Sequence, residues 1–130
     1  MNSVLQLMGL AKRAGRLALG EDMVAEAIQN HKARLILLAA DTGEATLRRT
    51  QKRAGDRVPV LQIAADKAEM GGALGRESCA VCALTDLGLA SKTAAALATE
   101  NRAFAPVAEE LERKQAKMLR RKKEKPRKKT

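Results

Sequence analysis

Two cysteines, Cys79 and Cys82, have the C-x-x-C spacing found in metal sites and redox motifs. The sequence contains no second cysteine pair, and its single histidine, His31, is far from both. The segment 78–84 is predicted to be a buried strand, in which residues three apart point to opposite faces. We therefore expect two free thiols in the core, with no metal and no disulfide.

The remaining polar residues do not form a recognisable catalytic set. His31 is predicted at a helix end and has no Ser or Cys nucleophile motif to accompany it, so we predict no catalytic residue. The glycines of segment 70–75 lack the G-x-G-x-x-G spacing, so we predict no cofactor. Asp41 follows a buried strand and could join Glu21 and Asp22 in a small-ligand or receiver-like site. Capping preferences favour the alternative that Asp41 caps the helix that follows it.

The segment 16–30 is the strongest candidate for a binding site, because it reads as a short strand, a glycine and a helix. Leu17 and Leu19 alternate around Ala18, as in a strand, and Gly20 allows a turn or a close approach to a partner. A helix that starts directly after a glycine is a natural docking point for a polyanion. The same pattern is also typical of an ordinary α/β connection.

Four cations lie close together on the predicted helix 44–54, at Arg48, Arg49, Lys52 and Arg53. They form two like-charged pairs at i,i+4 spacing. Such a run is either a phosphate-binding face or, more commonly, a solvated helix surface, and both interpretations stay open.

Most of the positive charge lies in the C-terminal part of the chain. The net charge is +10; residues 1–100 carry 13 Lys and Arg against 11 Asp and Glu, and residues 101–130 carry 12 against 4. Basic tails bind polyanions through counterion release, so nucleic acid is the predicted partner. We predict no membrane partner, because the tail lacks bulky apolar anchors. With neither a signal peptide nor a membrane-spanning run in the sequence, we expect a cytoplasmic protein.

Hydrophobic periodicity predicts an α/β protein of alternating elements. The expected helices are 3–14, 21–30, 44–54, 66–74 and 88–99, and the expected strands are 17–19, 33–40, 58–64 and 78–84. This alternation predicts helices on both faces of a mainly parallel sheet. Residues 1–100 should form one domain. Residues 101–130 should form a basic tail, helical from about Pro106 and disordered from about Arg121.

Several motifs in this order resemble the kink-turn-binding ribosomal proteins: Leu7-Met-Gly-Leu-Ala-Lys-Arg-Ala14, Gly20-Glu-Asp-Met-Val24, Leu35-Ile-Leu-Leu-Ala-Ala-Asp41, and Glu69-Met-Gly followed by Leu74-Gly-Arg76. This is the superfamily of the archaeal L-seven-Ae and eukaryotic L-thirty-e proteins, and the likeness is greatest to its bacterial YlxQ branch. The resemblance covers about residues 3–99. It implies a three-layer α/β/α sandwich around a mixed four-stranded sheet.

The resemblance also implies an RNA surface made from the start of the second helix and the loop before the last strand. The family's glycine matches Gly20, its Asn-Glu pair falls on Asp22 and Met23, and its lysine falls on Glu26. Its base-gripping loop falls near 76–78. Asp22 can accept but not donate a hydrogen bond, Met23 lacks an acceptor for base edges, and Glu26 repels phosphate.

We therefore predict a non-enzymatic RNA-binding protein of the ribosomal kind, with structured RNA, ribosomal RNA or the ribosome as candidate partners. The alternatives are an adaptor between proteins in ribosome assembly and the Asp41-based ligand domain. The predicted RNA-binding residues are Lys12, Arg13, Arg16, Gly20, Glu21, Asp22, Met23, Glu26, Lys32, Gly75, Arg76, Glu77 and Ser78.

Overall fold

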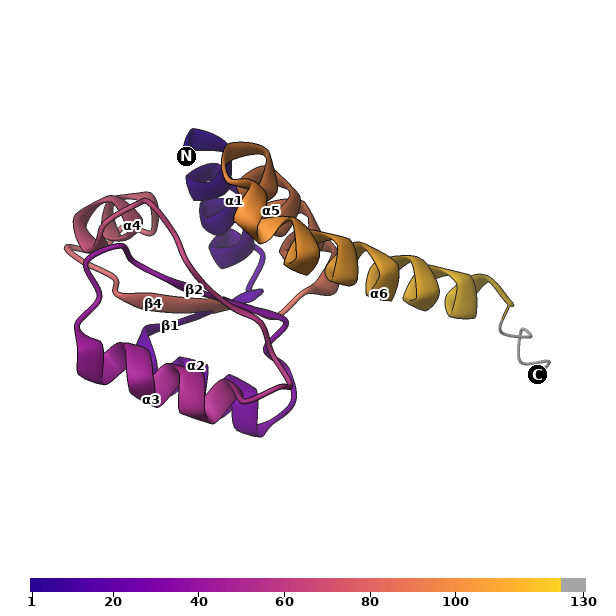
Figure 1. The fold of residues 1–130 in the computed structure, drawn as a ribbon, viewed down its shortest axis with the longest axis horizontal. Coiled ribbons are helices and arrows are strands. Elements are labelled where there is room, and N and C mark those ends of the chain that lie inside the picture. The colour runs from indigo at the N-terminus through magenta and orange to yellow at the C-terminus, as the bar shows by residue number, and fades with distance from the viewer. Residues whose placement is uncertain (125–130) are drawn as a thin grey trace.

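The fold is a four-stranded sheet between two layers of helices (Figure 1), which confirms the predicted three-layer α/β/α sandwich. The structure is a computed structural model that describes residues 1–124. One face of the sheet is covered by α2 (Gly20–Gln29) and α3 (Glu44–Ala54). The other face is covered by α1 (Asn2–Arg13), α4 (Lys67–Ala73) and α5 (Leu87–Glu100).

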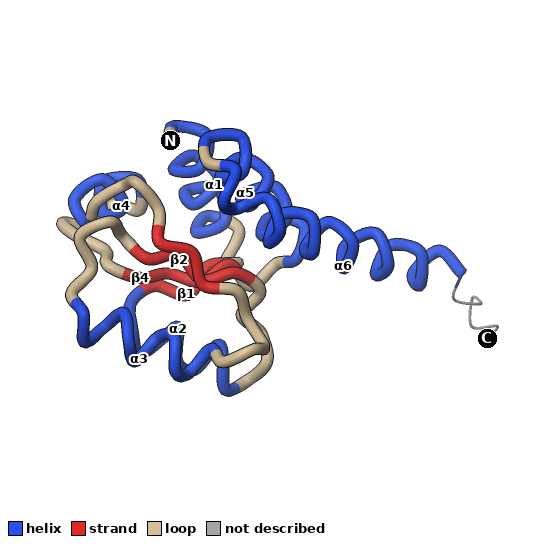
Figure 2. The backbone as a smooth tube through the Cα atoms, in the orientation of Figure 1, coloured by secondary structure: helices blue, strands red, loops and turns tan. Residues whose placement is uncertain are grey.

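The sheet is mixed, and its strand order is β1-β4-β2-β3 (Figure 2). The strands are β1 (Leu17–Leu19), β2 (Leu35–Leu38), β3 (Val60–Gln62) and β4 (Val81–Leu84). Strand β4 is antiparallel to both β1 and β2, and β2 is parallel to β3. The mainly parallel sheet predicted from the alternation of elements is therefore wrong, whereas the mixed sheet implied by the resemblance is confirmed.

The direction of β4 follows from where the chain enters it. The connection from β3 through α4, which has 7 residues, stays at the edge of the sheet where β2 and β3 end. The chain enters β4 from that edge, as the pairing of Leu38 with Val81 shows.

The two central strands are buried along their whole length, as predicted. Their side chains alternate between two cores. Leu35, Leu37, Cys82 and Leu84 belong to the core beneath α1, α4 and α5. The intervening residues of both strands face α2 and α3.

The ends of helices α1 to α5 agree with the predictions to within one or two residues, but the residues that cap them are not always the predicted ones. Gly15, with φ of +71°, follows the end of α1. That helix starts at Asn2, one residue before the predicted start, and has no side-chain cap. The amino group of Met1 instead pairs with Glu100 at 2.7 Å.

Asp41 does not cap the helix that follows it, so that prediction is wrong. Helix α3 begins after Gly43 and has no side-chain cap. Asp41 Oδ1 instead accepts a hydrogen bond of 2.8 Å from the backbone N–H of Lys67, the first residue of α4. Asp66 and Glu69 complete a capping box at the same helix start. Asp41 therefore ties the end of β2 to α4.

The C-terminal segment forms the long helix α6 (Ala105–Glu124), which follows a 3-10 turn and projects away from the sandwich (Figure 1). Leu111 is buried in the same core as α1 and α5, and Val107 packs against that core. The helix passes the predicted end near Arg121, and the remainder of the predicted disordered tail lies outside the described residues. Within residues 1–124, none of the helices could cross a membrane.

Candidate nucleic-acid interface

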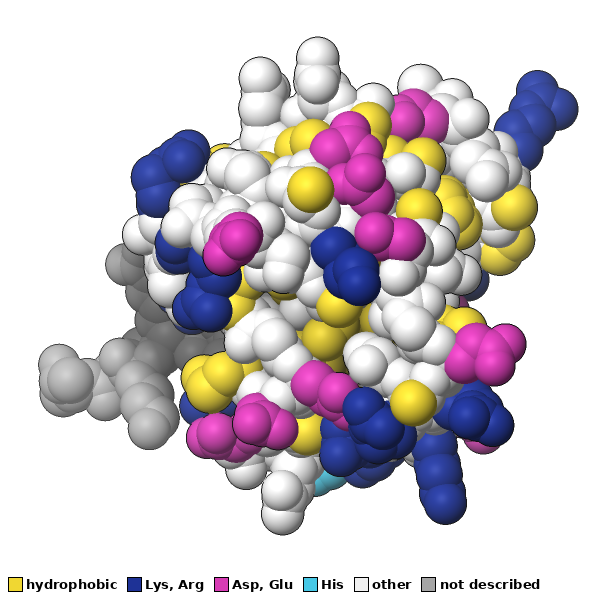
Figure 3. Space-filling model, turned by 90° about the vertical axis from the view of Figure 1, so that its left-hand side faces the viewer, with side chains coloured by type: hydrophobic (Ala, Val, Ile, Leu, Met, Phe, Trp, Pro, Cys, Tyr) yellow, Lys and Arg dark blue, Asp and Glu magenta, His cyan; other side chains and the backbone are white. Residues whose placement is uncertain are grey.

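The start of α2 and the loop after α4 meet at one edge of the sheet. Leu19 pairs with Cys82, so Gly20 lies beside the first residues of β4. The loop residues 75–78 lead into that strand from the end of α4. Figure 3 looks onto this edge, where acidic, basic and apolar side chains are mixed. We call the surface made by residues 20–23, Glu26 and residues 75–78 the docking face.

Gly20 has the backbone geometry that its position requires. Its φ is +85°, and no atom lies within 4 Å of where a Cβ would stand. The need for glycine here is therefore conformational rather than steric. No side chain caps the start of the helix; the Gly20 backbone hydrogen-bonds the Cys79 thiol, and the N–H groups that follow in the first turn are the ones that could meet an anion.

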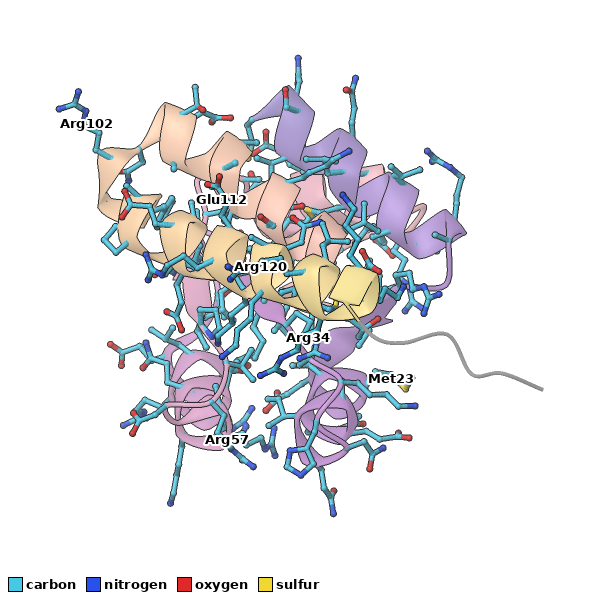
Figure 4. The ribbon with its side chains drawn as sticks, turned by 90° about the vertical axis from the view of Figure 1, so that its right-hand side faces the viewer. Met23, Arg34, Arg57, Arg102, Glu112 and Arg120 are labelled. Atoms are coloured by element: carbon cyan, nitrogen blue, oxygen red, sulfur yellow. The ribbon has the colours of Figure 1, made fainter. Side chains whose placement is uncertain are left out.

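Three of the predicted side chains project outward from α2. Asp22, Met23 and Glu26 are exposed, and Met23 is 53% exposed. Figure 4 shows Met23 pointing away from the protein. These positions can therefore touch a partner, but they offer it two negative charges and a thioether.

Glu21 points toward α3 instead, and it binds two arginines. Its carboxylate accepts hydrogen bonds from Arg49 Nη2 at 3.0 Å and from Arg53 Nη1 at 3.1 Å, and also from Arg49 Nε. The hydrogen bond from Arg49, followed by the charges of both arginines, lowers the pKa of Glu21 despite partial desolvation. Glu21 is therefore a link between α2 and α3.

The loop 75–78 is held tightly against α4. A Cβ on Gly71 would lie 2.6 Å from Ser78 Cα and 2.8 Å from Arg76 O, so no side chain fits there. The backbone N–H of Arg76 donates to Gly71 O at 2.8 Å. Gly75 has φ of +70°, which turns the chain out of the helix. Arg76, Glu77 and Ser78 are exposed at the tip.

The predicted basic residues do not all reach the docking face. Lys12 Nζ donates to the backbone oxygen of Leu74 at the end of α4, where a cation satisfies a free carbonyl. Arg16 directly precedes β1 and therefore lies at the opposite edge of the sheet from Gly20. Lys32 lies beyond the C-terminal end of α2, and it lines one pocket together with Met23 and Glu26 of the docking face. Arg13 is exposed at the end of α1.

The two cysteines are buried and free, but the prediction that they point to opposite faces is wrong. Cys79 lies two residues before β4, outside the strand, so the strand alternation does not apply to it. Both thiols belong to the same core. A hydrogen bond from the Cys82 thiol lowers the pKa of Cys79 to about 7, and Arg76 and the Gly20 backbone add to this effect. The same contact and burial raise the pKa of Cys82.

The four cations of α3 lie close together in the sequence, but only three of them face the same groove. Arg49, Lys52 and Arg53 line a groove between α2 and α3, and Arg48 does not. The like-charged i,i+4 pair of Arg49 and Arg53 is a signal that an anion lies nearby. That anion is Glu21. Glu21 reaches the two arginines only because α2 packs against α3, so local spacing could not identify it.

Fold and site together define an α/β/α sandwich of the ribosomal-protein type, with an uncapped helix start beside a tight loop. Residues 2–94 match the sequence model described as "Ribosomal protein L7Ae/L30e/S12e/Gadd45 family", and the chain belongs to this family.

Two curated relatives match this chain over stretches of similar length. A protein from Bacillus subtilis (strain 168) named RNA-binding protein YlxQ is 38% identical over 87 residues, which cover 66% of this chain and 86% of the relative. A protein of the same name from Enterococcus faecium is 32% identical over 90 residues, covering 68% and 85%.

Solved structures share the fold. A protein with unknown function from Bacillus halodurans C is 33% identical, with a TM-score of 0.66 over 71% of this chain and 93% of that one. The Giardia lamblia 15.5kD RNA binding protein is 18% identical, with a TM-score of 0.62, covering 77% of this chain and 85% of that chain. The latter likeness concerns the fold alone.

Proposed function

We propose that this protein binds structured RNA through the docking face and acts by binding rather than by catalysis. Ribosomal RNA, in the cytoplasm, is the candidate partner. The observation that carries the proposal is the pairing of Leu19 with Cys82, which sets the free start of α2 beside the loop 75–78 in a member of this family. Two relatives of the chain bear the name RNA-binding protein.

The chemistry of the docking face favours shape recognition over simple charge attraction. The first N–H groups of α2 and the exposed Arg76 offer donors to phosphate or base edges. Asp22 and Glu26 oppose phosphate at the same face. Affinity must therefore come partly from cations elsewhere on the molecule, such as those of α6.

The Asp41-based alternative has no support in the geometry. Asp41 Oδ1 is occupied by the first backbone N–H of α4. Among residues 1–124, no group of three or more His, Cys, Asp or Glu side chains converges there or elsewhere. The adaptor alternative is decided by the experiment that follows.

The test compares charge variants on a kink-turn RNA and on a plain duplex at one salt concentration. Glu26→Lys replaces repulsion by attraction, so binding should tighten by up to about tenfold. The double variant Met23→Glu with Glu26→Lys restores the pattern of the kink-turn readers and should favour the kink-turn over the duplex. Arg76→Ala should weaken binding to both RNAs.

Glu109→Lys is the matched control, because it makes the same charge reversal at an exposed site on the opposite layer of helices. Because its charge adds to those of α6, it should tighten both affinities by the same factor and leave the preference between the two RNAs unchanged, whereas the double variant should shift that preference. If Glu26→Lys, the double variant and Arg76→Ala all leave both affinities unchanged, the docking face is not an RNA surface, and the adaptor function replaces this proposal.

A further inference from the structure

A groove between α2 and α3 is lined on one side by cations. Its volume is about 670 Å³, and Arg49, Lys52, Arg53 and Arg57 line it along the α3 side. The α2 side contributes Ala25, Ile28 and Gln29, with His31 just beyond the end of the helix, and no acidic residue lines the groove. Figure 4 shows Arg57 reaching into the space between the two helices. The groove is thus cationic along the α3 side, and it mixes apolar and polar side chains along the α2 side.

The charges in this groove are only partly neutralised. Glu21 pairs with Arg49 and Arg53 at the end of the groove nearest the docking face. Among residues 1–124, Lys52 and Arg57 have no carboxylate within ion-pair distance. Two uncompensated cations beside two bridged arginines favour an anionic occupant with several charged groups. Guanidinium groups suit phosphate in particular, because their planar donors match its oxygens.

The position and length of the groove select the kind of anion. Glu21, at its mouth, is the neighbour of Gly20 on the docking face, so the groove continues that face along the helix layer. From Arg49 to Arg53 the helix rises by about 6 Å, and Arg57 follows beyond the end of the helix at Ala54. Phosphates of one strand repeat about every 3.4 Å along the axis of a DNA duplex, and an A-form RNA helix is more compact along its axis, so at least two phosphates can lie over this distance.

We propose that the groove binds the sugar–phosphate backbone of one strand of an RNA helix that extends from the docking face. The inference rests on the proposed function, since it assumes that RNA occupies that face. Lys52 and Arg57 supply unneutralised charge to the strand. Glu21 holds Arg49 and Arg53 at the mouth, in reach of the first phosphates.

The experiment uses the full chain and a kink-turn RNA whose two flanking helices are one full turn long. In Lys52→Gln with Arg57→Gln, the slope of log affinity against log salt should become shallower by about 1.5 to 2, since each phosphate that is no longer neutralised accounts for about 0.9. The double variant should keep the thermal stability of the wild type, because both side chains lie at the surface. With the flanking helices cut to half a turn, wild type and double variant should bind alike.

The matched control is Arg48→Gln with Arg102→Gln, which removes two exposed charges outside the groove. Figure 4 places Arg102 far from Arg57, on the opposite helix layer. The control should retain the wild-type slope. Equal loss of slope in the control and the groove variant would mean a general charge effect and would overturn the proposal.

The remaining outcomes separate this inference from the proposed function. If the wild type binds the RNA and the groove variant binds it with an unchanged slope, the groove proposal fails and the docking face stands. If the wild type does not bind, both fail. A nucleoside diphosphate is tested alone as well. Saturable binding of it that the groove variant abolishes would reassign the groove to a free nucleotide and overturn the strand proposal.

Discussion

Gly20 determines how the chain turns from β1 into α2, and its φ of +85° is unfavourable for residues with a Cβ. We expect Gly20→Ala to lower the free energy of unfolding by about 1–2 kcal/mol. Gly20→Asn should lower it less, because Asn tolerates the left-handed region better than Ala. Urea denaturation measures both. An Ala variant as stable as the wild type would mean that the turn from β1 into α2 does not require a positive φ at Gly20.

Glu21 makes the stability of the α2–α3 contact depend on pH. Its pKa is lowered from the ordinary value of 4.5 by Arg49 and Arg53, so its contribution is present above 4.5 and is lost as pH falls through the lowered pKa. Glu21→Gln should therefore be less stable than the wild type at neutral pH, and the difference should shrink as the pH falls from 4.5 through the lowered pKa. Urea midpoints measured over this pH range test this. Glu77→Gln, which removes no ion pair found among residues 1–124, should show no such convergence.

At the scale of elements, the contact between α4 and the loop 75–78 depends on one of two adjacent glycines. A Cβ on Gly71 would meet backbone at 2.6 Å, whereas one on Gly72 would meet nothing within 4 Å. Gly71→Ala should therefore displace the loop and cost roughly 1–3 kcal/mol. Gly72→Ala should be neutral or stabilising, because Ala favours the helix. The melting temperatures of the two variants, with RNA binding as a second measurement, distinguish the positions. Equal melting temperatures would mean that the loop 75–78 can move away from Gly71 at no cost in stability.

The same scale shows what local patterns could and could not predict. Hydrophobic periodicity located β1 at 17–19 and α3 at 44–54, because buried residues recur every second residue in a strand and every three to four residues in a helix. The direction of β4 could not be predicted in this way, since it depends on the pairing of β4 with β1 and β2, which are distant in the sequence. Cys79 was misplaced because its apolar run begins in a loop before the strand.

In the candidate site, the sequence left open whether Gly20 serves a turn or a close approach to a partner, and its φ of +85° shows the turn. Glu26, which the resemblance places on the RNA surface, is exposed. The partner of Arg49 could not be predicted, because Glu21 lies 28 positions away in the sequence and meets it only after α2 and α3 pack. Lys12 was assigned to RNA from its charge alone, and the structure engages it with the end of α4.

For the whole molecule, the basic segment and the core overlap within α6. Leu111 is 2% exposed and belongs to the main core, so the proposed division at residue 100 would remove part of that core. Ending the chain after Glu100 should lower the melting temperature. Leu111→Ala alone should cost about 2–4 kcal/mol. Wild-type stability of the chain ending at Glu100 would mean that α6 contributes nothing to the core and that residues 1–100 form the folding unit.

A chain ending at Ala116 separates charge from folding, because it keeps Leu111 and Gln115, which lies against Gly88 of α5. It loses residues 117–130, which hold nine Lys and Arg and one Glu. The shortened protein should melt like the full chain, while its log affinity for duplex RNA should fall less steeply with log salt, by about 0.9 for each phosphate that the C-terminal cations neutralise. The control is a full-length chain in which Lys117, Arg120 and Arg121 are replaced by Gln; it keeps the length of α6 and should lose part of the slope. If the slope of the shortened protein equals that of the full chain, the C-terminal cations do not contact RNA, and the affinity resides in the sandwich.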